Sequence, residues 1–241
     1  LSSSEKSLII GSIEATNEEP ITGDTSQYSA EELKVRAKTY YAAQGRAVTK
    51  QDYESLIYNM PTKYGSIKRA SIVNDPSATN RRMSLYVISD DSNNKLALCN
   101  SVIKQNLKNW LSTYRSMNDV IDIIDAKIIN FGVDFKILTD RRKNTYDILD
   151  LATQEIKDLF STTLYVGEPL YITNIYNALS KLEGVADVKN VKIYNINGGN
   201  YSTYKLDFDE IKSRDGTYIK VPDNVILELK YPESDIRGVA R

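Results

Sequence analysis

Two helix starts in the first quarter of the chain constrain its fold more than any other feature of the sequence. Ser29 is followed three residues later by Glu32, a spacing that lets a hydroxyl and a carboxylate satisfy each other's free backbone amides as a capping box. Thr49 repeats this arrangement with Asp52, whose charge also meets the positive end of a helix dipole. The sequence therefore predicts a helix of about 14 residues that ends at Gly45, and a second helix that begins after Thr49.

Segments rich in β-branched residues and bounded by turn signals predict strands after these helices. The predicted strands cover residues 66–74, 83–88, 120–130, 133–138, 185–194 and 225–229. Asp75-Pro76-Ser77 should turn the chain between the first two, which we expect to pair antiparallel. A bulge or tight bend is expected at Phe131-Gly132.

Amphipathic patterns predict three further helices. They cover residues 95–114, residues 145–160 and a short segment capped by Thr173. Cys99 lies on the apolar stripe of the first of these helices. We therefore expect its thiol to be buried as a small hydrophobic group and not to be reactive.

Together these elements predict an α+β protein with two small subdomains, each of which combines helices with an antiparallel or mixed sheet. The turn dipeptides Gly198-Gly199 and Asp215-Gly216 indicate a C-terminal segment rich in β-hairpins. The predicted parts are an N-terminal arm or linker (1–28), a first α+β subdomain (29–115), a second α+β subdomain (116–195) and a β-rich C-terminal extension (196–241).

The composition excludes several kinds of active site. The chain has no histidine, so it cannot form a Ser-His-Asp or Cys-His relay or offer an imidazole to a metal. Its single cysteine can form neither an internal disulfide nor a cysteine cluster for zinc. The sequence also lacks a glycine-rich loop of the kind that holds nucleotide phosphates. We therefore expect no catalytic residue, no metal ion and no cofactor.

The charge balance argues against two kinds of partner. The chain carries 31 basic and 32 acidic side chains, a net charge of −1, so nothing draws it as a whole to nucleic acid or to an anionic membrane. No window approaches the roughly 20 consecutive apolar residues that cross a bilayer. We expect neither nucleic-acid binding nor direct membrane insertion.

Pairs of carboxylates leave one catalytic alternative open, a domain that binds or hydrolyses glycans. A glycosidase needs two carboxyl groups that face each other across a cleft, about 5 to 9.5 Å apart. With 32 acidic residues in the chain, close spacings arise by chance, and solvated helix or strand faces explain them better. The pairs are Asp90 with Asp91, Asp122 with Asp125, Asp147 with Asp150, and Asp207 with Asp209.

Tyrosine is unusually frequent, with 17 residues, about 7% of the chain against about 3% in soluble proteins. Its large apolar ring and polar tip suit a surface that is wet in the free protein and buried on assembly. Some tyrosines should simply fill half-buried strand positions, as expected for Tyr86 and Tyr194. A non-catalytic module that stacks sugars or bases on tyrosine rings is a further alternative.

The sharpest basic cluster is Arg141-Arg142-Lys143, directly before the helix predicted for residues 145–160. The positive end of a helix dipole repels each cation by about 0.3–1 kcal/mol. The simpler interpretation is a solvated loop that projects away from the helix. The alternative is that these three residues meet an acidic surface of another chain.

One segment of the chain resembles a known family. The run Gln44-Gly45-Arg46-Ala47-Val48-Thr49 leads into Asp52-Tyr53-Glu54-Ser55-Leu56, and Pro61 and Gly65 precede Ile67-Lys68-Arg69-Ala70. This order is similar to that of the baseplate J-like family of contractile phage tails. There, an Arg-Ala-Val-Thr-x-x-Asp-Tyr-Glu run ends one helix and caps the next, before a strand with an Arg-Ala or similar pair. The resemblance covers roughly residues 29–194.

The resemblance implies a structural subunit of the baseplate wedge and ring, without enzymatic activity. Such a subunit forms homodimers, joins neighbouring wedge and hub proteins, and rearranges when the sheath contracts. It would be located in the tail baseplate of the virion after assembly in the cytoplasm of the infected bacterium. A tail-associated domain that binds or hydrolyses glycans is the alternative in the same setting.

The family motif residues are expected to maintain the fold. They are Arg46, Thr49, Asp52, Tyr53, Gly65 and Arg69. Thr49 should cap, Asp52 should balance the helix dipole, and Tyr53 should pack in the core. Gly65 should turn the chain, and Arg46 should bond carbonyls at the end of the preceding helix.

Overall fold

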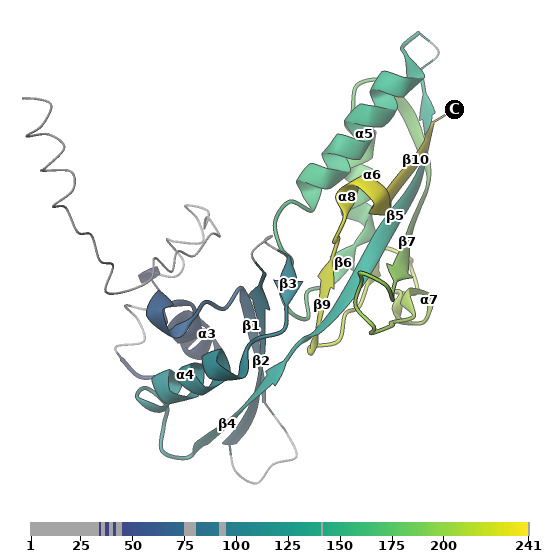
Figure 1. Cartoon of the computed structure of the whole chain (residues 1–241). Coiled ribbons are helices and arrows are strands. Elements are labelled where there is room, and N and C mark those ends of the chain that lie inside the picture. The colour runs from purple at the N-terminus through teal and green to yellow at the C-terminus, as the bar shows by residue number, and fades with distance from the viewer. Residues whose placement is uncertain are drawn as a thin grey trace, which may run out of the picture.

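The computed structural model describes residues 34, 37, 38, 41, 45–74, 81–91, 95–140 and 142–240. Some predictions lie outside these residues: the N-terminal arm, the capping box of Ser29 and Glu32, the turn at Asp75-Pro76-Ser77, and Arg141. The described part is an α+β protein with two four-stranded sheets and one two-stranded sheet, which confirms the predicted fold class. Figure 1 shows the two larger sheets one beyond the other along the molecule.

The helices are α3 (Lys50–Tyr58), α4 (Ser101–Ser112), α5 (Thr145–Leu159), α6 (Ile172–Ser180), α7 (Phe208–Ile211) and α8 (Pro232–Asp235), with a 3₁₀ turn η1 (Thr62–Tyr64). The strands are β1 (Arg69–Asn74), β2 (Arg81–Asp90), β3 (Leu96–Ala97), β4 (Asp119–Asp125), β5 (Lys127–Thr139), β6 (Leu170–Tyr171), β7 (Val185–Ile196), β8 (Tyr218–Ile219), β9 (Val225–Glu228) and β10 (Ile236–Ala240). We call residues 45–125 the first half and residues 126–240 the second half.

The sheet of the first half is built around β2. As predicted, β1 pairs with β2 antiparallel, and Arg69 lies opposite Ile88. On the other edge β4 pairs with β2 in parallel, and two residues of β3 extend that edge antiparallel. Helices α3 and α4 lie over one face of this sheet (Figure 1).

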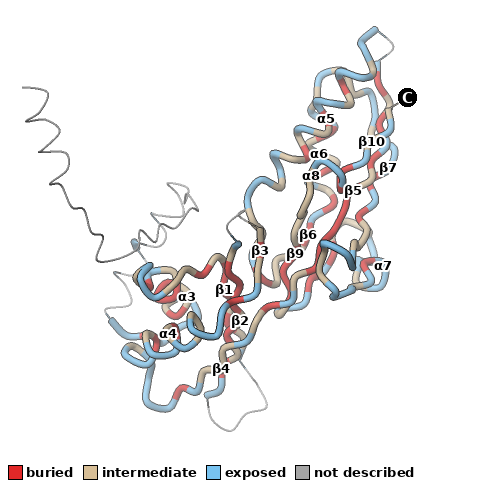
Figure 2. The backbone as a smooth tube through the Cα atoms, in the orientation of Figure 1, coloured by how far each residue is buried: buried red, intermediate tan, exposed pale blue. Residues whose placement is uncertain are grey.

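Alternation along β2 explains why helices cover this face. Met83, Leu85 and Val87 are two residues apart, so they point to the same side, and each is at most 2% exposed. They pack in one cluster with Leu56 of α3 and Leu107 of α4. Burial of each such side chain contributes about 1.5–3 kcal/mol. Figure 2 shows buried positions on α3, β1 and β2 that meet in this layer.

The sheet of the second half is built around β5, the longest strand with 13 residues. β7 pairs antiparallel along one edge, with two register shifts near its start. β9 and β10 pair in parallel along the other edge, with Val225 opposite Lys127 and Ile236 opposite Val133. Strands from the C-terminal segment therefore complete a sheet that begins in the middle of the chain.

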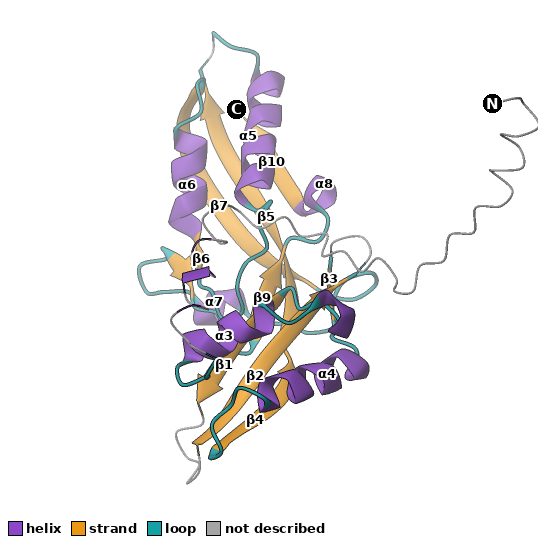
Figure 3. Ribbon diagram, turned by 90° about the vertical axis from the view of Figure 1, so that its left-hand side faces the viewer, coloured by secondary structure: helices purple, strands orange, loops and turns teal. Residues whose placement is uncertain are grey.

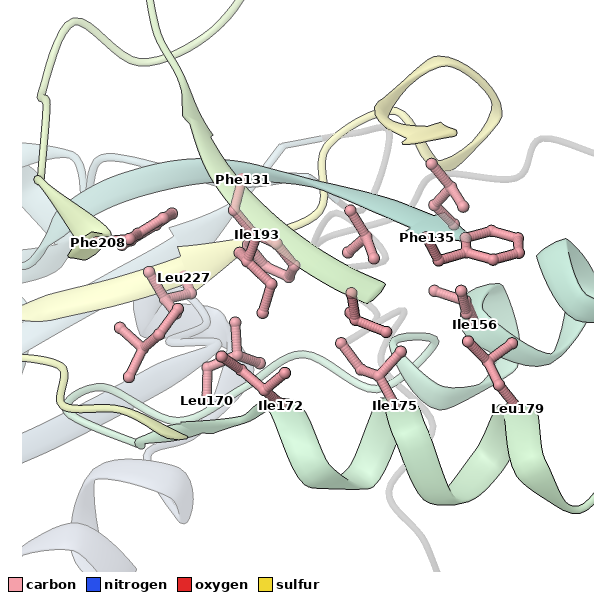
Figure 4. Close-up of a cluster of buried hydrophobic side chains, with 14 of the residues drawn as sticks. Phe131, Phe135, Ile156, Leu170, Ile172, Ile175, Leu179, Ile193, Phe208 and Leu227 are labelled. Carbon is pink, nitrogen blue, oxygen red and sulfur yellow. The ribbon is translucent and has the colours of Figure 1, made fainter. Parts of the chain in front are cut away.

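Helices α5 and α6 lie side by side over one face of this second sheet (Figure 3). Phe131 and Phe135 of β5 point toward Ile156 of α5 and Ile175 of α6, as Figure 4 shows. All four side chains are at most 1% exposed. This cluster is the larger core of the molecule.

The structure corrects the predicted bend at Phe131-Gly132, because β5 runs through both residues without a break. The interruption falls instead at Ala126, between β4 and β5. A Cβ atom on Gly132 would lie 2.5 Å from Cζ of Tyr194 and 2.8 Å from the carbonyl oxygen of Asp235. Glycine is required here for the close approach of neighbouring groups and not for a turn.

Two predicted helix starts are also corrected. Helix α4 begins at Ser101, because the Asn100 side chain accepts a hydrogen bond from the Val102 N–H, while residues 96–97 form β3. Cys99 thus precedes the helix, but it is buried as predicted, and burial, followed by the charge of Asp125, raises the pKa of its thiol to about 11. Thr173 lies inside α6, and the N-cap residue that precedes this helix, Tyr171, provides no side-chain hydrogen bond.

The C-terminal segment turns tightly at both predicted dipeptides: the Tyr201 N–H bonds the Gly198 carbonyl at 3.1 Å, and the Gly216 N–H bonds the Ser213 carbonyl at 2.9 Å. The Ser213 N–H bonds the Tyr218 carbonyl at 2.9 Å, and Lys212 forms an antiparallel bridge with Ile219. Strand β8 continues this contact by pairing with β6. Strands β9 and β10 do not pair with each other. They pair with successive stretches of β5, residues 127–130 and 133–137.

Candidate functional site

The residues that resemble the baseplate J-like motif surround the start of α3, where the predicted capping box is present. Thr49 Oγ1 accepts the N–H of Asp52 at 3.2 Å, and Asp52 Oδ2 accepts the N–H groups of Thr49 at 2.8 Å and Val48 at 3.1 Å. Desolvation alone would raise the pKa of Asp52, but these hydrogen bonds outweigh it, and the pKa lies below its ordinary value. The capping roles predicted for Thr49 and Asp52 are confirmed.

Tyr53 does more than pack, because its hydroxyl anchors α3 to the sheet. The buried hydroxyl donates to Asp119 Oδ2 at 2.6 Å, and Asp119 Oδ1 lies 3.4 Å from Arg81 Nε. Burial, together with the hydrogen bond and charge of Asp119, raises the pKa of Tyr53 well above its ordinary value. Asp119 is 1% exposed, so this is a buried charge held by two partners.

Sequence reasoning did not identify Asp119 or Arg81 as partners of the motif. Arg81 also donates to the carbonyl of Val48, so the segment before α3 is tied to β2 as well. On the other side, the N–H of Ala47 bonds the carbonyl of Tyr114 at 3.0 Å. A signal was present in the sequence, since Asp119 is an acidic residue at the edge of an apolar strand segment, a position that usually needs a partner.

Gly65 turns the chain as predicted, with φ of +109°, a conformation that favours glycine. Its N–H closes η1 on the carbonyl of Thr62. A Cβ atom here would also lie 2.7 Å from Cγ1 of Ile103 on α4. Gly65 therefore permits both the backbone turn and the packing of α4 against it.

Arg69 has the least expected position of the motif residues, because it reaches from the first half to the second. The residue is 5% exposed, and its Nε and one terminal nitrogen donate to the carbonyl of Thr163 at 3.3 and 2.9 Å. The guanidinium also lies 4.6 Å from the ring centre of Tyr165, within range of a cation–π contact. Both partners belong to the loop that follows α5. Arg69 thus fastens the two halves together.

Further contacts connect the two halves beside Arg69. The N–H of Leu96 donates to Glu228 Oε1 at 2.7 Å, and the Asn130 side chain donates to Oε2 of the same carboxylate at 2.8 Å. A small apolar cluster fills the space between the sheets, formed by Ile88, Leu96, Ala126, Val166 and Ile226. We call these contacts and those of Arg69 the junction.

A cavity of about 270 Å³ opens at the junction. Its apolar lining includes Phe131, Phe160 and Leu227, and Lys95 and Lys157 lie at its edge. Lys157 already pairs with Glu233 at 2.7 Å, and Lys95 lies 3.6 Å from the ring centre of Tyr231. Among the described residues, no group of three or more acidic or cysteine side chains is placed to hold a metal ion.

The basic cluster before α5 is only partly described. The backbone N–H of Arg142 bonds Asp140 Oδ1 at 3.1 Å, and Lys143 pairs with Glu183 at 2.6 Å. The hydrogen bond and charge of Lys143 lower the pKa of the exposed Glu183. A contact with an acidic surface of another chain stays a prediction. The same holds for the expected bond of the exposed Arg46, since the end of the preceding helix lies outside the described residues.

The carboxylate pairs have structural surroundings. Asp122 and Asp125 are three residues apart on β4 and so point to opposite faces, where they pair with Arg82 at 2.6 Å and Lys104 at 2.5 Å. Asp207 caps α7 by accepting the N–H of Asp209 at 3.0 Å. Asp90 pairs with Lys68 at 3.4 Å, while Asp147 and Asp150 are exposed on α5.

Within the described part of the chain, none of the helices has both the length and the apolar character needed to cross a lipid bilayer.

Comparison with known proteins shows a likeness in fold. No model of a protein family matches the chain, and no curated protein sequence matches it. The structure is similar to a chain of the anti-feeding prophage baseplate, determined by cryo-EM with six-fold symmetrisation, with a TM-score of 0.50 and 15% sequence identity. The match covers 83% of this chain but 41% of the other, so this chain spans less than half the length of the chain it matches. The two proteins share a fold.

Proposed function

We propose that this chain is a structural subunit of the baseplate of a contractile, phage-tail-like particle. The observation that carries the proposal is the agreement of two independent likenesses. The fold of 83% of the chain is similar to a chain of the anti-feeding prophage baseplate. The run from Arg46 to Glu54 resembles the motif of the baseplate J-like family. One likeness lies in the backbone fold and the other in the amino-acid sequence.

A finer assignment within the baseplate follows from the sequence resemblance. We assign the chain to the wedge, where it pairs with a second copy, joins neighbouring wedge and hub proteins in a ring, and takes part in the rearrangement that accompanies sheath contraction. Its C-terminal stretch, residues 224–238, resembles the T-even phage wedge protein encoded by gene six more than shorter members of the family. Its place is then the tail baseplate of the virion, after assembly in the cytoplasm of the infected bacterium.

The contacts of the motif suit a building block that must transmit force without unfolding. The motif ties α3 to its sheet through Tyr53 and Asp119, and it ties the first half to the second through Arg69. These polar contacts are buried, so salt and solvent weaken them little. A subunit that bears load between neighbours needs such fixed connections between its parts.

Interrupting the gene in the organism that produces the particle tests the proposal. Without the chain, we expect tails to stop before a complete baseplate forms, so that electron microscopy of lysates shows few or no intact particles. Supplying the wild-type gene from a plasmid should restore them. A plasmid that carries an exposed substitution away from the motif, Lys108→Ala, is the matched control and should restore them equally. Normal numbers of intact, contractile particles without the chain would contradict the proposal.

A further inference from the structure

One face of the second sheet is uncovered by any described helix, and three basic side chains are exposed on it. On this face Asp134 of β5 lies between Lys192 of β7 and Arg237 of β10, its partners on the two neighbouring strands. In the next row Lys136 lies beside Val239, which is 47% exposed. We call these five residues, with Leu138 and Tyr194 beside them, the open sheet face. Its three basic side chains are all exposed.

Acidic side chains on this face are fewer. Asp134 is already set between two cations, and Asp187 lies opposite Leu138 at the far end. At the other end, Tyr194 lies over Gly132, and the Ser202 N–H donates to Asn130 Oδ1 at 2.7 Å. The uncovered part is therefore the basic part, which combines Lys136, Lys192 and Arg237 with apolar side chains between them.

The outer face of α5 has the opposite charge. Asp147, Asp150 and Asp158 are exposed. Asp150 follows Asp147 by three residues, and Asp158 follows Asp150 by eight, so the three side chains lie along one side of the helix. Tyr146 and Leu151 on the same side are 79% and 56% exposed. The one lysine of α5, Lys157, follows Asp150 by seven residues, and its charge is paired with Glu233 at 2.7 Å. We call this surface the acidic helix face.

The second sheet and α5 form two layers, with α5 packed on one face of the sheet and the open sheet face on the other (Figures 1 and 3). The acidic helix face and the open sheet face therefore lie on opposite sides of this structure. A molecule with complementary surfaces on opposite sides can bind a second copy head to tail. Repetition of such a contact builds a ring or a filament, depending on the rotation between copies.

We propose that the acidic helix face of one copy docks on the open sheet face of the next, so that the partner of this surface is a second copy of the same chain. The proposal deepens the self-association that the proposed function includes, and in that respect it rests on that function. Three aspartates meet three cations, and apolar side chains lie among the charges on both surfaces. Complementary charges of this kind steer association and fix the orientation of the partner.

Self-association of the full chain tests the contact, measured by sedimentation velocity over a range of protein concentrations. We expect wild-type chains to associate, and the association to weaken when the salt concentration rises, because exposed charges are screened. Asp147→Lys with Asp150→Lys on the helix, or Lys136→Glu with Lys192→Glu on the sheet, should each weaken association at least tenfold. An equimolar mixture of the two variants should associate again, since a basic helix then meets an acidic sheet.

Controls separate this contact from general damage. Lys108→Glu with Lys220→Glu removes the same number of exposed lysines elsewhere and should leave association unchanged. The charge-reversing sheet variant places two new glutamates beside Asp134, and repulsion among these three carboxylates could lower stability. Lys136→Gln with Lys192→Gln removes the two positive charges without adding acids, so it should weaken association without lowering the melting temperature. Wild-type chains that stay monomeric at low salt, reversals without effect, or a loss that the mixture does not restore would each overturn the contact.

These outcomes differ from a failure of the proposed function. A chain that belongs to a baseplate but associates through other surfaces would overturn the head-to-tail contact and leave the proposed function standing. A chain that associates through these two faces and is absent from every baseplate would do the reverse.

Discussion

The two halves of the molecule differ in how far apart their strand partners lie in the sequence. In the first half the four paired strands, β1 to β4, all come from residues 69–125, and one helix, α4, lies between β3 and β4. In the second half β5 takes β9 and β10 from the far C-terminal segment as partners. The first half also carries the run that resembles the baseplate J-like motif, whereas the second supplies the larger core. The sheet of the first half thus forms from strands of one continuous part of the chain, whereas the sheet of the second half depends on pairing between distant segments.

The largest expected effect comes from the core of the second half. Phe135→Ala removes a ring that is 1% exposed and should lower the free energy of unfolding by about 3–5 kcal/mol, because the cavity cannot close fully. Urea unfolding followed by circular dichroism measures the change. Leu151→Ala on the exposed side of α5 is the matched control and should change the free energy by less than about 0.5 kcal/mol.

The same experiment shows whether the halves behave as one body. The junction connects the two sheets through buried contacts, so Phe135→Ala and Leu85→Ala should shift a single, common unfolding transition. Two transitions, each moved by only one of the substitutions, would show that the halves unfold independently and that the junction is weak.

The next largest effect comes from the buried anchor of the first half. Tyr53→Phe removes the hydrogen bond to Asp119 and leaves a buried carboxylate oxygen without its donor. Hydrogen bonds to charged groups contribute about 1.5–3 kcal/mol, and we expect a loss of unfolding free energy in that range. Tyr58→Phe offers a comparison within the same helix, since its hydroxyl accepts a hydrogen bond from a neutral amide, the Ala70 N–H. Equal losses from both substitutions would argue against a special role for Asp119.

The hydrogen bond of Tyr53 should also make the free energy of unfolding depend on pH in the alkaline range. The pKa of Tyr53 is raised in the folded protein above its unfolded value of about 10. The folded state therefore holds this proton more tightly, and the stability it contributes is complete below about pH 10 and is lost as the pH rises further. Unfolding free energies measured between about pH 8 and 11 should fall less steeply for Tyr53→Phe than for wild type. Parallel slopes would contradict this assignment.

Arg69→Lys tests the fastening between the halves. A lysine keeps the charge but cannot direct two N–H groups at the carbonyl of Thr163, so we expect a loss of about 1–2 kcal/mol. Hydrogen exchange should also become faster in residues 163–167 while the cores stay protected. Unchanged exchange in that loop would mean that Arg69 does not hold the junction.

The smallest effect is expected at the cap of α3. Thr49→Ala removes the acceptor of the Asp52 N–H and should cost about 1 kcal/mol, whereas Thr49→Ser should restore most of it. Because the pKa of Asp52 is lowered in the folded state, the stability it adds is present above its unfolded value and is lost as the pH falls through the folded pKa. Thermal melts at neutral and acidic pH measure both effects.

Sequence patterns predicted the local features well. The capping box at Thr49, the antiparallel pair β1–β2 and the helix over residues 145–159 all follow from spacing and propensity within about 15 residues. The burial of Cys99 and the turn at Gly65 have the same origin. In each case the residues that determine the structure are close neighbours in the chain.

Long-range features could not be read from such patterns. Nothing local to Val225 or Ile236 shows that both will lie beside β5, and nothing near Arg69 identifies Thr163 as its partner. The sequence predicts a bulge or bend at Phe131-Gly132 because the groups that require a glycine there, Tyr194 and Asp235, are distant in sequence. The division of the chain at residues 28, 115 and 195 stays a prediction. Of the strands after residue 196, β9 and β10 join the second sheet, whereas β8 pairs with β6.

The most direct test of the central claim is a cryo-EM map of the intact particle in which side chains are resolved. We predict that the two connected sheets, with α5 and α6 over one face of the second, fit density in the baseplate around its central hub. A map that resolves the whole baseplate and leaves no density for this chain, or that places it only in the sheath or fibres, would contradict the account.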